Sequence, residues 1–130
     1  MDSLRHLAAV AALGGMLTNE NHSHMARFAL ERIPAAEAAR ALRDALGKTT
    51  GVVKVGVIGS LGARRDVDAI AAIGGLLGDG DSAVARAATL ALGAIGTADA
   101  VAVLQRALQT GGGQRSSMVD ALLSCAESLL

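Results

Sequence analysis

The sequence has almost no aromatic residues and no excess of either charge. Its 130 residues include one Phe and no Trp or Tyr, while 12 Lys and Arg side chains balance 12 Asp and Glu. Nucleic-acid binding relies on positive charge and on aromatic rings that stack on bases, so no nucleic-acid partner is expected. Apolar runs also fall short of the roughly 20 residues that cross a bilayer, so no membrane-spanning helix is expected.

Cysteine is equally scarce, with one copy. Cys125 therefore cannot form an intramolecular disulfide or a zinc site built on several thiolates. It falls within the apolar pattern near the C-terminus and has no His close to it in the sequence, so we predict a buried, unreactive thiol rather than a nucleophile. His22 and His24 would not face each other on a helix. No third ligand is evident, so neither a metal site nor another cofactor is expected.

The N-terminus partly imitates a signal peptide. An apolar stretch covers residues 7–17, but Asp2 stands where such peptides carry positive charge, and no A-x-A cleavage site follows. The stretch fits a first helix better. The compartment stays open, with the cytoplasm favoured over the periplasm.

Alanine is abundant, with 28 copies, and most other apolar positions hold Leu, Val or Ile. Alanine is the best helix former, and the aromatic residues that favour strands are almost absent. The composition therefore predicts an all-helical domain whose thin helices pack closely.

The sequence repeats itself with a period of 31 residues. Shifting the chain by this period places the Leu-Gly-Ala of residues 61–63 on that of residues 92–94, and three copies share the frame. Glu37, Asp68 and Asp99 fall at the same place in successive copies, each in a first helical turn where the helix dipole favours negative charge. Such a period is typical of stacked helical hairpins, because one hairpin cannot bury its own apolar stripe.

Each copy is predicted to contain a helix, a turn and a second helix, because the apolar spacing breaks at Gly and Asp and then resumes. Asp81 or Ser82 is the expected N-cap of one second helix, and Thr97 or Asp99 that of the helix after it. We predict eight helices, paired as four hairpins, over residues 3–17, 22–33, 35–46, 51–63, 66–78, 82–95, 98–109 and 115–128.

One stretch, DSAVARAATLALGAIGTADAVAVLQRAL, resembles the HEAT repeat, in particular the short bacterial variety related to phycobilisome-lyase repeats. Repeats of that kind read V-R-x-x-A-x-x-A-L-G-x-I-G before a second apolar helix. Here Ala85 separates Val84 from Arg86, which leaves open the usual ion pair between this Arg and the preceding Asp. The resemblance implies an all-α, right-handed α-solenoid of about four hairpins over residues 1–130, with the second helix of each pair on the concave side.

The same resemblance implies a non-catalytic module that binds or scaffolds another protein. The alternative is a lyase-like HEAT protein that acts on a bound chromophore or small molecule. The chain ends on apolar residues without a polar capping helix, so we expect either a piece of a longer repeat protein or self-association through exposed terminal helices.

A rival interpretation concerns three glycines. Residues 52–66 read like a strand that enters a nucleotide-binding turn, but Gly56, Gly59 and Gly62 are spaced G-x-x-G-x-x-G rather than G-x-G-x-x-G. On a helix, the three glycines would leave a shallow bare strip. We expect a neighbouring helix to pack closely on it, or a bound partner to cover it.

Arg64 breaks the repeat, because it aligns with Ile33 and Ile95 at a position predicted to be buried. Such breaks tend to mark functional or strained sites. A modest cationic patch for an acidic protein partner could combine four residues: Lys54, Arg64, Arg65 and Arg86.

The alternative places Arg64 and Arg65 at a helix C-terminus, where they would satisfy backbone carbonyls. There they would also pair with Asp66 or Asp68.

Overall fold

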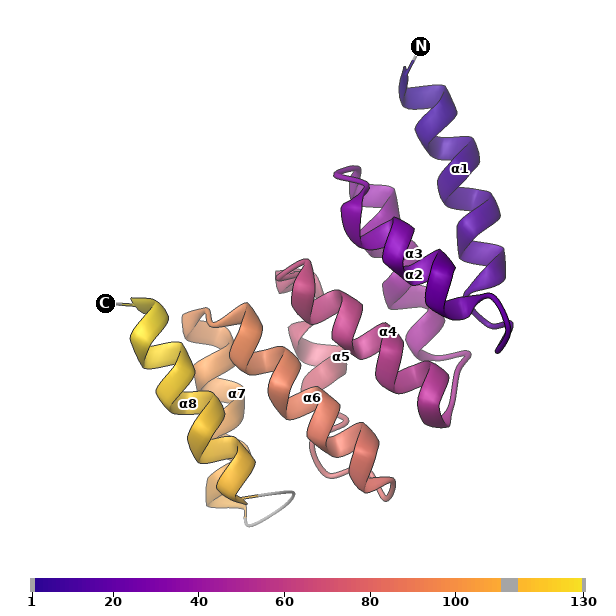
Figure 1. Ribbon diagram of the computed structural model, residues 1–130. Coiled ribbons are helices and arrows are strands. Elements are labelled where there is room, and N and C mark those ends of the chain that lie inside the picture. Colours follow the sequence, from indigo (N-terminus) through magenta and orange to yellow (C-terminus); the bar gives the residue numbers. More distant parts are fainter. Residues whose placement is uncertain (1, 111–114, 130) are drawn as a thin grey trace.

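The computed structural model describes residues 2–110 and 115–129. Within these ranges the chain forms eight α-helices and one 3₁₀ turn. The elements are α1 (Asp2–Met16), α2 (Ser23–Arg32), α3 (Ala36–Leu46), α4 (Gly51–Ala63), η1 (Val67–Ala69), α5 (Ile70–Gly74), α6 (Ser82–Ile95), α7 (Ala98–Gln109) and α8 (Arg115–Leu129). Successive hairpins stack side by side into an α-solenoid, and the start of α1 extends beyond the other helices (Figure 1).

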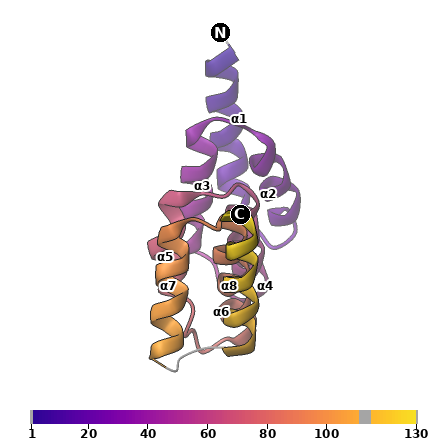
Figure 2. The same cartoon turned by 90° about the vertical axis from the view of Figure 1, so that its left-hand side faces the viewer.

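The hairpins form two layers, seen end-on in Figure 2. The first helices α5 and α7 lie on one side, and the second helices α4, α6 and α8 lie on the other. Two rows of fully buried side chains fill the space between the layers, both with the 31-residue period. The second helices contribute Leu30, Leu61 and Leu92, and the first helices contribute Leu42, Ile73 and Leu104. Each such side chain stabilises the fold by about 1.5–3 kcal/mol.

The second helices pack closely because glycine stands at the contact points. A Cβ atom added to Gly62 of α4 would lie 3.0 Å from the Cα of Ala91 in α6, and one added to Gly93 of α6 would lie 3.3 Å from the Cα of Ala121 in α8. The prediction of close packing on the glycine strip is thus confirmed for Gly62. These close contacts explain why the Leu-Gly-Ala sequence recurs.

The predicted caps and most predicted helix bounds are confirmed. The Asp81 side chain accepts a hydrogen bond from the backbone N–H of Ala83, and the Thr97 side chain accepts one from that of Ala100. Seven of the eight predicted helices agree with the structure to within one residue at each end.

The prediction of a continuous helix over residues 66–78 is wrong. This segment opens with η1, continues as the five-residue α5, and ends in turns after Gly74. Two adjacent glycines, Gly74 and Gly75, weaken the helix. The following N–H groups bond three residues back, from Leu76 to Ile73 and from Leu77 to Gly74, which is 3₁₀ geometry.

Candidate functional site

Large apolar side chains are exposed mainly on the second helices. On α2, α4, α6 and α8 these are Met25, Phe28, Val52, Leu90, Val119 and Leu123. Elsewhere in the described residues, Leu4 and Leu7 of α1 and Val67 of η1 are also exposed. Met25 and Phe28 share one side of α2, and Val119 and Leu123 share one side of α8, because residues three or four apart are neighbours on a helix. We call the outward side of these four helices the second-helix face.

Two shallow hollows open on this face. The hollow between α4 and α6 encloses about 300 Å³, and Val55, Gly59 and Ala63 line it on one side, with Ala87, Leu90 and Ala94 on the other. The hollow between α6 and α8 encloses about 350 Å³, and its lining includes Asp120 and Ser124 of α8. Leu90 belongs to both hollows and is 59% exposed. It forms an apolar ridge between them.

Leu90 was not among the residues predicted to bind a partner, although the repeat marks its position. Phe28, Gly59 and Leu90 stand 31 residues apart and therefore occupy one position in successive repeats. That position points outward, because all three residues are exposed. An apolar residue at an outward position of a repeat is the pattern that would have identified this surface.

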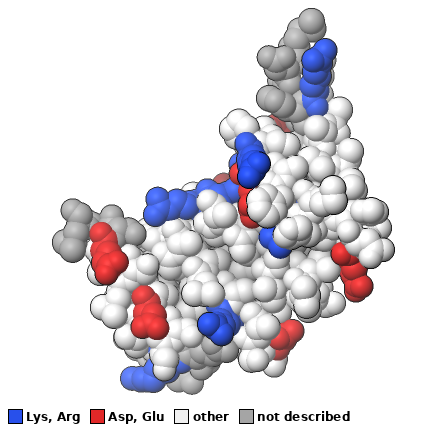
Figure 3. All heavy atoms as spheres, in the orientation of Figure 1, with Lys and Arg blue, Asp and Glu red and all other residues white. Residues whose placement is uncertain are grey.

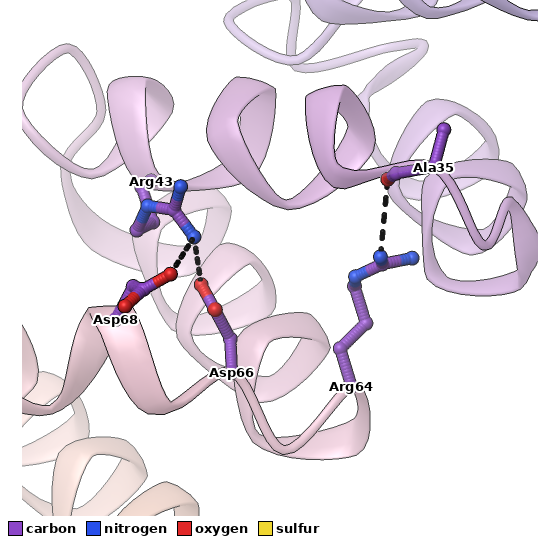
Figure 4. A network of polar contacts seen from close by, with 5 residues as sticks. All are labelled: Ala35, Arg43, Arg64, Asp66 and Asp68. Atoms are coloured by element: carbon purple, nitrogen blue, oxygen red, sulfur yellow. Dashed lines mark hydrogen bonds and ion pairs between the residues drawn. The ribbon is translucent and has the colours of Figure 1, made fainter.

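Arg64 lies at the C-terminal end of α4 and turns toward the preceding hairpin. Its guanidinium donates hydrogen bonds to backbone carbonyls where α2 ends and α3 begins. Figure 4 shows the bond to Ala35. The acceptors include the carbonyl oxygens of Leu30 at 2.8 Å and Ala35 at 3.3 Å. The Leu30 carbonyl has no intrahelical donor, because the residue four positions later is Pro34, which has no N–H. The Ala35 carbonyl also accepts a hydrogen bond from the N–H of Ala38. Arg64 therefore lies at a helix C-terminus and satisfies backbone carbonyls, as the alternative interpretation predicted. The carbonyls belong to the preceding repeat.

Arg65 turns the other way. Its Nε donates a hydrogen bond to the carbonyl of Ala94, near the end of α6, at 2.9 Å. The two adjacent arginines thus link the end of α4 to both of its neighbours among the second helices.

The predicted pairing of these arginines with Asp66 or Asp68 is wrong. Arg43 of α3 lies between the two carboxylates instead, with its Nη1 2.6 Å from Asp66 and 4.0 Å from Asp68 (Figure 4). The Asp66 side chain is 9% exposed and that of Asp68 is 76% exposed. Arg64 points away from both carboxylates because its guanidinium donates hydrogen bonds to the carbonyls between α2 and α3.

The structure does not gather the four predicted cations into one patch. Lys54 lies in α4 and Arg64 directly follows it, ten residues away, which is about 15 Å along a helix. Arg86 of α6 is exposed and, within the described residues, makes no hydrogen bond or ion pair. On the side of the molecule drawn in Figure 3, some Lys and Arg side chains are surrounded by uncharged surface and others lie beside Asp or Glu. The partner-binding role of these cations stays a prediction.

His22 lies directly before α2, and His24 lies within it. The Nδ1 of His24 lies 2.9 Å from Nη2 of Arg27, and its ring packs edge-on against Phe28. The described residues contain no group of three or more His, Cys, Asp or Glu side chains arranged to hold a metal ion.

Cys125 is buried in α8, as predicted. Its thiol points at the carbonyls of Leu92 and Gly93 in α6, at 3.9 and 3.8 Å. Burial raises the pKa of the thiol above its ordinary value of 9.0. The thiolate that a nucleophilic cysteine needs is therefore disfavoured.

Comparison with known proteins identifies the repeat. The family model for HEAT repeats matches residues 42–123, which run from α3 into α8. No curated protein and no solved structure matches the chain. None of the helices in residues 2–110 and 115–129 has the length and apolar character needed to span a membrane. Because the family match covers more than half of the chain and the structure is a stack of helical hairpins with the same period, the chain belongs to the HEAT-repeat family.

Proposed function

We propose that the chain is a non-catalytic protein-interaction or scaffold module that binds its partner through the second-helix face. HEAT repeats are generally modules of this kind. The observation that carries the proposal is the concentration of exposed Met, Phe, Val and Leu side chains on that face. Exposed apolar patches often mark interaction surfaces, because removing them from water stabilises a complex.

We take this face to be the concave side of the solenoid. Close contacts at Gly62 and Gly93 bring α4, α6 and α8 near one another. The hollows between these helices hold about 300 and 350 Å³, whereas the one between α5 and α7 in the other layer holds about 480 Å³. In a curved stack the more closely spaced layer lies on the inside, which supports this assignment.

The four cations remain part of the proposal as contacts for acidic groups on the partner. Arg86 is the most available of them, since it is exposed and unpaired within the described residues. Arg65 keeps two terminal nitrogens beyond the one that bonds to Ala94. Lys54 is partly buried, and Arg64 is engaged with four carbonyls. We therefore expect charge reversal at Arg86 to weaken binding more directly than reversal at Arg64.

Self-association through the terminal helices extends the proposal. Leu4 is 71% exposed on α1 and Leu123 is 60% exposed on α8. Light scattering over a range of protein concentrations tests this, with Leu4→Asp and Leu123→Asp compared with the wild type. A mass that stays that of one chain at every concentration would reject self-association.

Affinity capture tests the proposed binding face. The wild type, Leu90→Asp and Val67→Asp are immobilised after circular dichroism shows that all three are helical. Val67 is the matched control, because it is 55% exposed but lies in η1, away from the second-helix face. We expect Leu90→Asp to lose a protein that the wild type and Val67→Asp both retain.

Equal capture by all three proteins would reject the second-helix face as the binding surface. A small molecule retained through purification, or turnover of an added bilin, would instead favour the lyase-like alternative. The cytoplasm stays the predicted compartment, and fractionation of native cells tests it.

A further inference from the structure

The hollow between α4 and α6 centres on a glycine that the fold does not require. An interior helical glycine costs about 1 kcal/mol relative to alanine. At Gly56 a Cβ atom would lie 2.6 Å from Nε of Arg27, and at Gly62 it would lie 3.0 Å from the Cα of Ala91. At Gly59 a Cβ atom would meet nothing within 4 Å. Packing against backbone therefore accounts for Gly62, and the Arg27 side chain lies over Gly56, but no neighbour within the chain explains Gly59.

Gly59 also interrupts a row of outward apolar side chains. Phe28 of α2 and Leu90 of α6 occupy the same repeat position and are 44% and 59% exposed. The missing side chain leaves the hollow of about 300 Å³ between α4 and α6. This trough runs from Val55 to Ala63 along α4, about 12 Å or two helical turns. A helix laid into such a trough can insert a side chain between the two walls.

Arginine side chains surround the trough, and no carboxylate lines it. Arg65 lies at one end, bonded to the carbonyl of Ala94, which is a lining residue. Arg86 precedes Leu90 by one turn of α6, and Arg27 covers Gly56 one turn before Gly59. A partner with carboxylates on both sides of an apolar side chain would complement this charge.

We propose that the trough binds an amphipathic helix of the partner protein that places one large apolar side chain over Gly59. Asp or Glu residues about one turn to either side of that side chain pair with Arg65, Arg86 and Arg27. This inference rests on the proposed function and specifies the partner's chemistry. A glycine at position 59 is then explained, because any larger side chain would occupy the space that the partner needs.

Selection from a random dodecapeptide phage library provides the probe. Peptides selected on the wild-type chain are synthesised, and their affinities are measured for the wild type, Gly59→Leu and Gly15→Leu. Gly15 of α1 is the matched control, because a Cβ atom there also meets nothing within 4 Å. We expect a consensus with one Leu, Ile, Met or Phe flanked at three or four positions by Asp or Glu. Gly59→Leu should weaken binding about tenfold or more, as loss of a central apolar anchor does, and Gly15→Leu should not change it.

The other outcomes overturn the inference in different ways. Peptides that bind Gly59→Leu as tightly as the wild type, yet lose affinity for Leu90→Asp, would reject the Gly59 trough and leave the proposed function standing. A basic consensus would reject the charge complementarity. Selected peptides that bind Leu90→Asp and Gly59→Leu without loss would contradict both the inference and the proposed function.

Discussion

Arg65 and Gly96 stand 31 residues apart and share a left-handed backbone conformation, with φ of 53° and 67°. Each lies just beyond the end of a second helix, where glycine is the usual residue. The N–H of Gly96 bonds to the carbonyl of Leu92, while Arg65 and Asp66 donate to the carbonyls of Gly62 and Leu61. A residue other than glycine costs roughly 1–2 kcal/mol in this conformation. Arg65 offsets part of this cost with its hydrogen bond to Ala94.

This relationship predicts different effects for two substitutions of Arg65. Arg65→Gly relieves the backbone strain while losing the exposed hydrogen bond, so its unfolding free energy should stay within about 1 kcal/mol of the wild type. Arg65→Ala loses the hydrogen bond and keeps the strain, so it should be about 1 kcal/mol less stable than Arg65→Gly. Urea denaturation of both variants measures the difference. Equal stability of the two would show that backbone strain at this position is negligible.

Arg64 should matter to stability more than any exposed arginine. Arg64→Met keeps much of the side-chain volume but removes the side-chain donor of the Leu30 and Ile33 carbonyls. We expect a loss of about 1–3 kcal/mol of unfolding free energy. Arg86→Met is the control, with an expected change within about 0.5 kcal/mol, because Arg86 is exposed and unpaired in the described structure. Chemical denaturation of the two variants tests this. Similar losses of unfolding free energy in both would show that the hydrogen bonds from Arg64 to the preceding hairpin do not stabilise the fold.

The two acidic partners of Arg43 should differ in importance. Asp66 is 9% exposed and lies 2.6 Å from the guanidinium, whereas Asp68 is 76% exposed and 4.0 Å away. Asp66→Asn removes a mostly buried charge partner, and we expect a loss of about 1–3 kcal/mol. Asp68→Asn should cost less than about 1 kcal/mol, as exposed pairs do. Thermal unfolding of the two variants compares their stabilities. A larger loss of stability for Asp68→Asn would show that Asp68, not Asp66, is the more important partner of Arg43.

The repeat frame predicted the helices and the core because both follow from local spacing. Leu30, Leu61 and Leu92 recur with one period and are all fully buried. The same spacing also explains why a helix over residues 66–78 was predicted where α5 covers only Ile70–Gly74. Leu77 follows the buried Ile73 by four residues and is itself buried although it lies outside the helix, so the apolar spacing of a full helix continues through the turn.

The polar contacts could not be predicted in this way. Arg43 and Asp66 are 23 residues apart and come from different hairpins. The acceptors of Arg64 are backbone carbonyls, which carry no signal in the sequence. The candidate binding face was not predicted because the predicted site residues are cations, whereas this surface is formed by outward apolar residues such as Leu90.

The buried thiol of Cys125 predicts a dependence of stability on pH. Burial holds the pKa of the folded thiol above 9.0, its ordinary value. Above pH 9 the unfolded chain therefore loses a proton that the folded chain keeps, so the unfolding free energy should fall as pH rises toward the folded pKa. Cys125→Ala should reduce this slope. Denaturation at several pH values between 7 and 10 measures it, and an identical slope in the variant would show that another group is responsible.

Gly59 and Gly62 should respond to alanine with opposite signs, although they lie one turn apart on α4. Gly59→Ala gains helix propensity and meets no neighbour, so the unfolding free energy should rise by about 1 kcal/mol. Gly62→Ala gains the same propensity but places its Cβ atom 3.0 Å from the backbone of Ala91. Backbone cannot move aside without separating α4 from α6, so overpacking of about 1–3 kcal/mol should exceed the gain. Chemical denaturation of the two variants decides the sign. A destabilised Gly59→Ala would mean that the glycine serves the fold, which would remove the case for a partner side chain above it.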